Sequence, residues 1–166
     1  MNSRIIVTLL AGNTFRARAY AQQLAQIKHE QIVVKGFFYG FKQKPISEVF
    51  IDDITKNYLT KEDLLIPDLN ENIKTTFEQN NWNYVEYYDE NVNESNLILE
   101  LNKINTDIIV FCGYGGQLLR SGHFQSSKKD LHMHPGILPS ERGSTTLYYS
   151  ILSNRSLGVT AFYMTE

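Results

Sequence analysis

Short apolar runs alternate with amphipathic stretches along most of the chain. The runs at residues 4–10, 31–39 and 107–112 are rich in β-branched and aromatic residues, which is typical of strands buried on both faces. Between the first two runs, residues 15–28 place apolar side chains at helical spacing: Ala17, Tyr20, Ala21, Leu24 and Ile27. This succession of strand, turn, helix and strand predicts a βαβ unit with a parallel sheet.

The rest of the chain continues this alternation. The pattern predicts strands at 82–88, 129–134 and 157–164, and helical segments at 70–80, 96–103, 117–121 and 145–152. Residues 41–70 contain Lys44-Pro45 and Ile66-Pro67, which interrupt regular structure, so we expect a long surface connection with one short helix. The expected packing residues of the 145–152 helix are Tyr148, Tyr149, Ile151 and Leu152.

These elements predict a single α/β domain over residues 1–166, with a Rossmann-like parallel sheet and helices on both faces. The length allows a real hydrophobic core. The sequence stops directly after the apolar strand 157–164. Domains rarely end on a central strand, so we expect either that this strand lies at an edge or that the domain is incomplete at its C-terminus.

Composition and charge narrow the class of protein. No apolar run approaches the ~20 residues of a membrane span, and the single cysteine, Cys112, excludes an internal disulfide, so we expect a cytoplasmic protein without membrane contact. The net charge of −2 argues against general nucleic-acid binding. The charge is uneven, at +6 over residues 1–47, −9 over 48–95 and +1 over 96–166. The acidic middle fits a solvated helical face, and the basic first part could face an anionic ligand.

The best candidate for chemistry is the histidine pair at the end of the 129–134 strand. His132 and His134 occupy alternate positions, which point to the same face of a strand, and Pro135 ends the strand. Open α/β sheets bind ligands at the carboxyl ends of strands, and imidazole changes charge near neutral pH. We therefore expect His134 to project into a ligand-sized hollow, as an acid, a base or an oxyanion donor. The alternatives are half of a metal site and a purely structural pair.

Two glycine-containing turns follow predicted strands. The turn 12–14 (Gly-Asn-Thr) could bind an anion on free helix N–H groups, with Arg16 and Arg18 nearby; a plain tight turn is the alternative. The turn 113–116 (Gly-Tyr-Gly-Gly) would let a ligand approach the backbone closely. Neither turn has the spacing of a dinucleotide or phosphate-loop fingerprint, so we exclude NAD. Cys112 fits a small buried residue better than a nucleophile.

One long motif carries a resemblance to a known family. Residues 132–143 read His-Met-His-Pro-Gly-Ile-Leu-Pro-Ser-Glu-Arg-Gly, and Gly-Val-Thr follows at 158–160. This resembles the signature Asn-x-His-Pro-Ser-Leu-Leu-Pro-x-aromatic-Arg-Gly of the formyltransferases that use 10-formyltetrahydrofolate. Residues 107–119 also resemble the segment that lines the folate pocket of that family. The match is specific across 107–164 and loose over the first hundred residues.

The resemblance implies particular roles for the two histidines. His134 matches the family histidine that stabilises the oxyanion when an amine attacks the formyl carbon. His132 takes the place of an asparagine that donates to the formyl oxygen. Glu141 replaces an aromatic residue, and the family aspartate would lie beyond Glu166. A carboxylate keeps such a histidine protonated, whereas a second imidazole lowers its pKa, so we expect weak or no activity from these 166 residues.

The candidate site residues fall into three groups. The catalytic pair is His134 and His132. The residues expected to bind 10-formyltetrahydrofolate, the formyl donor, are Cys112, Gly113, Tyr114, Gly115, Gly116, Gln117 and Leu118. Those expected to bind the acceptor are Gly12, Asn13, Thr14, Arg142 and Gly143. No metal is expected.

The resemblance implies formyl transfer to an amine of a small metabolite, such as an amino sugar, by a domain that could form a homo-oligomer. The methionyl-tRNA version needs a basic C-terminal domain, which this sequence does not contain, so nucleic acid is not an expected partner. Two alternatives remain. One is a hydrolase that releases formate from formyltetrahydrofolate, and the other is a catalytically silent domain that binds a folate or a partner protein.

Overall fold

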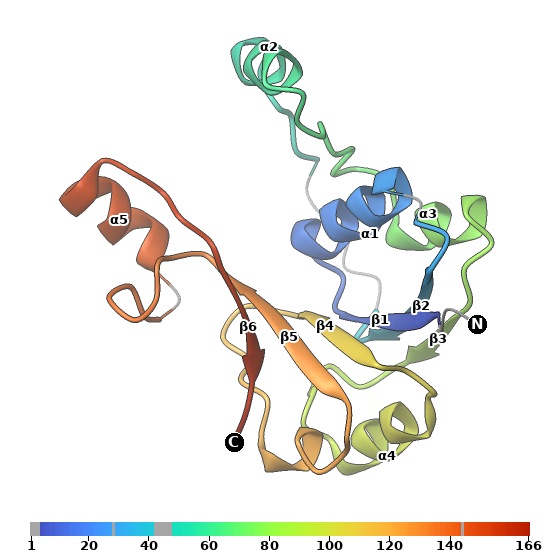
Figure 1. The fold of residues 1–166 in the computed structure, drawn as a ribbon. Coiled ribbons are helices and arrows are strands. Elements are labelled where there is room, and N and C mark those ends of the chain that lie inside the picture. Colours follow the sequence, from blue (N-terminus) through green and yellow to red (C-terminus); the bar gives the residue numbers. More distant parts are fainter. Residues whose placement is uncertain (1–3, 28, 42–47, 144) are drawn as a thin grey trace.

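The computed structural model describes residues 4–27, 29–41, 48–143 and 145–166 (Figure 1). Six strands form one sheet in the order β3-β2-β1-β4-β5-β6. The strands are β1 (Ile5–Ala11), β2 (Ile32–Tyr39), β3 (Tyr84–Tyr87), β4 (Ile108–Cys112), β5 (Lys129–His134) and β6 (Thr160–Met164). The helices are α1 (Phe15–Ile27), α2 (Asp53–Lys61), α3 (Ile73–Gln79), α4 (Ser95–Lys103), α5 (Thr146–Asn154) and the short 3-10 helix η1 (Ser121–His123).

Helices cover both faces of the sheet, as predicted. α1 and α3 lie on one face and α4 lies on the other (Figure 1). In β1, Leu9 and Ala11 pack into the cluster shared with α1 and α3, whereas Leu10 packs into the cluster shared with α4. The central strands are therefore buried on both sides, which explains their continuous apolar runs.

β6 departs from the parallel arrangement that the sequence predicted. The pairs β1–β2, β1–β4, β2–β3 and β4–β5 are parallel, but β6 runs antiparallel to β5, with Phe162 opposite His132 and Thr160 opposite His134. It lies at the edge of the sheet, which is one of the two placements expected. Side chains alternate with a period of two in either strand direction, so the pattern carried no information on direction.

The other predicted elements are present, with ends that differ by at most three residues, except at 117–121. Only Ser121–His123 forms a helical turn there. Gln117 instead extends toward the sheet, where its side chain bonds Tyr39 and the Glu90 carbonyl. In the described part of the 41–70 connection, α2 is the short helix that was expected. Lys28, the predicted end of the first helix, and Lys44-Pro45 lie outside the described residues.

The packing predicted for α5 is wrong. Tyr148 and Leu152 are 72% and 79% exposed, and Tyr149 and Ile151 are also exposed. The buried positions are the small polar residues Thr146 and Ser150, and the Thr146 hydroxyl donates to the Pro135 carbonyl. α5 lies away from the sheet, at the end of an arm that starts after β5 (Figure 1). Helical spacing reveals an apolar face, but it does not tell which neighbour covers that face.

Phe77 of α3 anchors one half of the core. It is fully buried, and its ring meets Phe38 and Trp82 edge-on at centroid distances of 5.0 and 5.2 Å. We predict that Phe77→Ala lowers the free energy of unfolding by about 3–5 kcal/mol, because it removes buried apolar surface and leaves a cavity. Tyr88→Ala, which truncates a ring that is 80% exposed, should change it by less than ~0.5 kcal/mol. Urea unfolding followed by circular dichroism measures both, and equal losses would contradict this account of the core.

Candidate functional site

Tyr114 ties together the carboxyl ends of three strands. It follows β4, and its hydroxyl donates to the carbonyl of Gly40, after β2, at 2.7 Å. The same hydroxyl accepts the backbone N–H of Asn13, after β1, at 3.1 Å. A Cβ on Gly12 would lie 2.8 Å from the Tyr114 ring, so the close approach requires glycine there. This is the edge at which open α/β sheets bind ligands.

Tyr39, the last residue of β2, makes a second link at this edge. Its buried hydroxyl donates to Gln117 Oε1 at 2.7 Å and accepts the N–H of Tyr114 at 3.3 Å. Gln117 in turn donates to the Glu90 carbonyl at 2.6 Å. Burial raises the pKa of Tyr39, so the hydroxyl stays neutral. A Cβ on Gly113 would meet this hydroxyl. Sequence reasoning missed Tyr39 and Glu90, because nothing in their local pattern marks them.

The residues predicted to bind the folate fall into two sets. Residues 112–114 belong to the hydrogen-bonded network of Tyr39 and Tyr114, called the Tyr39–Tyr114 frame below. The Cys112 side chain is fully buried, so it cannot contact a ligand in this structure. Residues 115–118 are accessible. A Cβ on Gly115 would have no atom within 4 Å, and Leu118 is 82% exposed. Of the predicted segment, only its second half offers a surface to a ligand.

The start of α1 brings two arginines to the same edge. Thr14 Oγ1 accepts the N–H of Ala17 at 3.2 Å, which caps the helix. Arg16 Nη2 donates to the Gly113 carbonyl at 2.8 Å. Arg18 is only 7% exposed, and its guanidinium donates to Asn13 Oδ1 at 3.1 Å and to a main-chain carbonyl at 2.6 Å. The turn 12–14 and the β4 end, separated by about a hundred residues, are thus in direct contact.

Neither guanidinium has a carboxylate partner among the ion pairs of the described residues, which involve only lysines. The Nε atoms of Arg16 and Arg18 are buried without a hydrogen-bond partner. Burial lowers the pKa of Arg18, and the negative charge of Asp68 opposes this effect. Positive charge beside a helix N-terminus favours an anionic ligand. The turn itself offers fewer donors than expected, because Tyr114 already takes the N–H of Asn13.

β5 carries His132 and His134 toward its carboxyl end, as predicted. Their ring centres are 6.3 Å apart. The His132 ring lies near Phe111 of β4 and Phe162 of β6, at centroid distances of 6.1 and 5.8 Å. Burial lowers the pKa of His132, and the charges of Arg16 and His134 add to the effect. His132 is therefore a neutral imidazole at neutral pH.

His134 is more enclosed than the sequence suggested. It is 9% exposed, and its Nε2 donates to the Glu141 carbonyl at 2.7 Å. A cavity of about 270 Å³ lies beside the loop that follows β5, and its lining residues are Ser140, Glu141, Arg142, Thr146, Tyr149 and Ser153. The expectation that the His134 ring itself faces a hollow is not met at this cavity, because the loop folds back and Glu141 takes the hydrogen bond.

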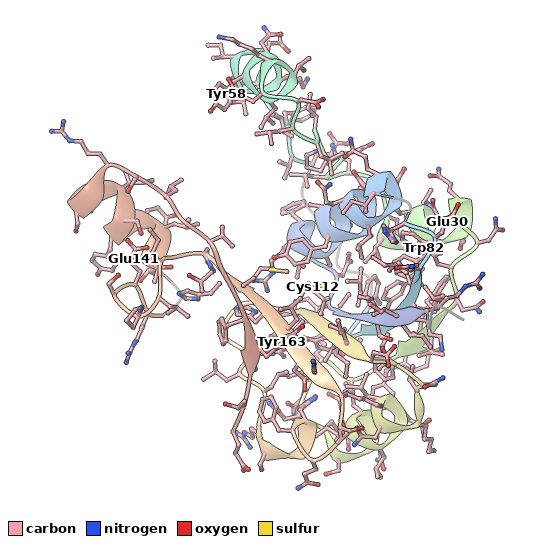
Figure 2. The ribbon with its side chains drawn as sticks, in the orientation of Figure 1. Glu30, Tyr58, Trp82, Cys112, Glu141 and Tyr163 are labelled. Carbon is pink, nitrogen blue, oxygen red and sulfur yellow. The ribbon has the colours of Figure 1, made fainter. Side chains whose placement is uncertain are left out.

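Arg142 and Gly143 are not brought to the other residues predicted to bind the acceptor. Figure 2 shows Glu141, their neighbour, on the arm that carries α5, well apart from Cys112 at the sheet. The Arg142 Nε donates to the Pro139 carbonyl at 3.0 Å, within the same loop. The predicted acceptor residues therefore form two separate groups, one at the start of α1 and one on this arm.

Two kinds of feature are absent from the described residues. No group of three or more His, Cys, Asp or Glu side chains there is arranged to hold a metal ion. Among the same residues, no helix has the length and apolar character needed to cross a bilayer.

The chain is similar in sequence to known formyltransferases. The chain is 33% identical over 76 residues to the methionyl-tRNA formyltransferase of Rhodopirellula baltica, a stretch that covers 45% of this chain and 22% of that protein. It is 32% identical over 82 residues to the enzyme of the same name from Listeria monocytogenes, covering 48% of this chain and 26% of that one. The chain thus matches about a quarter of the length of these curated relatives. No protein-family model matches it.

Solved structures share the fold. Glycinamide ribonucleotide transformylase 1 from Symbiobacterium toebii matches with a TM-score of 0.59 at 14% identity, over 99% of this chain and 67% of its own. A sugar N-formyltransferase from a Shewanella species matches with a TM-score of 0.54 at 13% identity, over 98% of this chain and 52% of its own. The chain therefore has the α/β fold of the formyltransferases. Together with the curated relatives, this confirms the resemblance to the formyltransferase family that the 132–160 motif indicated.

Cys112 provides a test of how tightly the frame is packed. Its Sγ donates to the Leu10 carbonyl at 3.6 Å, and burial raises the pKa of the thiol to about 12. We predict that the folded chain does not react with Ellman's reagent at pH 8, because the thiolate is scarce and out of reach. In denaturant the same cysteine should react at once. Fast reaction of the folded chain would contradict the packing described for residues 112–114.

Proposed function

We propose that this domain transfers the formyl group of 10-formyltetrahydrofolate to the amine of a small metabolite, such as an amino sugar. The observation that carries the proposal is the pair His132 and His134 at the carboxyl end of β5, within a formyltransferase-like motif and on a formyltransferase fold. Relatives named as sugar N-formyltransferases and glycinamide ribonucleotide transformylases support a small acceptor.

The chemistry required is stabilisation of charge on oxygen. Attack of an amine on a formyl carbon builds negative charge on the formyl oxygen, and the amine must lose a proton. Because the Glu141 carbonyl holds Nε2–H of His134, a protonated ring presents its Nδ1–H to the oxygen. A neutral ring presents the Nδ1 lone pair, which accepts the proton of the amine. The neutral His132 supplies a second hydrogen-bonding group beside it.

The ligand contacts are proposed from accessibility and charge. Residues 115–118 are the proposed surface for the folate, because they are the open part of the predicted segment. The turn 12–14, with Arg16 and Arg18, is the proposed contact for an anionic part of the acceptor. Arg142, with Gly143, is proposed to contact the acceptor from the cavity on the arm that carries α5.

Two other outcomes use the same groups. A hydrolase would take water as the nucleophile and release formate without any amine. The curated relatives are named for methionyl-tRNA, so the amino group of that molecule belongs among the acceptors assayed. Formate release and amine formylation, measured side by side, separate these reactions.

Gly115→Val tests the folate surface. A Cβ at Gly115 meets open space, so the variant should unfold at the temperature of the wild type, while its side chain should lower the affinity for 10-formyltetrahydrofolate at least tenfold. Calorimetric titration measures the affinity. The matched control is Ser127→Val, an exposed position before β5 and thus at the opposite end of the sheet, which should bind like the wild type. A wild-type chain that binds no folate would overturn the proposed function.

His134→Ala tests the proposed charge stabilisation. In an active form of the chain, extended through the next aspartate, we expect the rate of formyl transfer or formate release to fall by about 10²–10³, with a small change in KM, because the lost donor acts mainly on the transition state. His29→Ala removes an exposed histidine far from β5 and serves as the control. Unchanged turnover in His134→Ala would remove His134 from the mechanism.

A further inference from the structure

The surface proposed for the folate, residues 115–118, lies between β4 and η1 in the chain and outside both elements. The regular backbone hydrogen bonds of a helix or strand therefore do not hold it. Its largest apolar side chain, Leu118, is 82% exposed. A loop that must first be ordered binds a ligand weakly, because the ordering costs conformational entropy. Groups from elsewhere in the chain must fix this segment if it is to bind well.

Asn93, in the loop before α4, holds the end of this segment. Its Nδ2 donates to the Leu118 carbonyl at 2.9 Å, and its Oδ1 accepts the N–H of Arg120 at 2.9 Å. One side-chain amide thus pairs with a backbone acceptor and a backbone donor two residues apart, as a neighbouring strand would. The pairing needs a side chain that both donates and accepts at its tip, which an amide does.

The same loop holds the other side of Leu118. Gln117 Oε1 accepts the Tyr39 hydroxyl at 2.7 Å, and its Nε2 donates to the Glu90 carbonyl at 2.6 Å. After Leu118, the side chain of Leu119 packs against the core cluster on the α4 side of the sheet. The exposed Leu118 side chain therefore stands on a backbone that is held on both sides.

Asn93 is itself fixed in place. Val92, which precedes it, is fully buried, and the Val92 carbonyl accepts Nε2–H of the buried His123 at 2.9 Å. The N–H of Asn93 donates to Asn91 Oδ1 at 3.1 Å. Glu94, which follows it, caps the start of α4 with its side chain. Asn93 thus lies between a buried residue and a helix start, so its amide can hold the less regular segment in position.

We propose that Asn93 is a positioning residue for the folate surface. Its amide fixes the backbone of residues 118–120, so that Leu118 and the open glycines before it are in place when the ligand arrives. This inference rests on the proposed function, because it concerns the same ligand and the same surface. Both hydrogen bonds lie near solvent, so they contribute little to the stability of the whole fold.

Asn93→Ala removes both hydrogen bonds and tests the proposal. Calorimetric titration with 10-formyltetrahydrofolate should give a Kd about tenfold higher than that of the wild type, because the ligand must then order the segment. The unfolding temperature should change little. A residue that only stabilised the fold would give the reverse result, a lower unfolding temperature with the same Kd. The matched control is Asn102→Ala, at an exposed position of α4, which should bind like the wild type.

A second variant and a measurement on the wild type make the test sharper. Asn93→Asp keeps the size of the side chain and an acceptor for Arg120, but it puts an oxygen in place of the donor to the Leu118 carbonyl. It should therefore also raise the Kd. In the wild type, labelled with ¹⁵N and ¹³C, NMR should detect a coupling through the hydrogen bond between Arg120 ¹⁵N and Asn93 ¹³Cγ.

Absence of this coupling, or an unchanged Kd in folded Asn93→Ala, overturns the proposal. Failure of Asn93→Ala to fold also contradicts it, because the fold would then depend on this amide. The coupling is measured without any ligand. A wild type that shows it but binds no folate would refute the proposed function and leave the hydrogen bonds of Asn93 standing, whereas folate binding that is equal in both chains would refute only the role of Asn93.

Discussion

The candidate site depends on two tyrosines at the carboxyl edge of the sheet. Tyr114 joins the ends of β1, β2 and β4 through one hydroxyl, and Tyr39 extends the link to Gln117. Each tyrosine lies too close to a glycine to leave room for a Cβ atom: Tyr114 lies against Gly12, and the Tyr39 hydroxyl lies against Gly113. These hydrogen bonds lie partly out of water, where an unmade bond is costly, so they hold the start of α1 against the end of β4. Because the start of α1 is held there, Arg16 and Arg18 lie at the carboxyl edge of the sheet.

β5 shows how a sheet accommodates polar chemistry. Asp130, His132 and His134 share one face of a strand whose neighbours on both sides are largely apolar. Desolvation raises the pKa of Asp130 to about 6 and lowers that of His132, so burial favours the neutral form of both groups. His134 instead obtains a carbonyl partner from Glu141, which orients its ring. Burial and hydrogen bonding thus set the surroundings of the two imidazoles.

The arm after β5, which carries α5, packs in a way that the local sequence pattern did not predict. Periodicity predicted α5 correctly as a helix, yet its apolar residues face outward and Thr146 and Ser150 face inward. Periodicity likewise placed β6 but not its direction. The motif 132–143 pointed to the family, but it could not show that Glu141 would bond His134, or that Glu141 would lie well apart from Cys112 at the sheet (Figure 2). Each of these outcomes depends on where a distant segment lies.

The amino-acid order was sufficient for the α/β class, for nearly all helices and strands, for the two histidines on β5 and for the family resemblance. These properties are encoded locally, since side-chain period and turn residues act over a few neighbours. Only the tertiary structure determined that the edge strand β6 is antiparallel and that Tyr39 and Tyr114 are hydrogen-bonded to each other. It also determined that the side chains of Cys112 and Asp130 are buried. Such features arise from contacts between residues far apart in the chain, and the free energy of burial belongs to the assembled sheet rather than to any one segment.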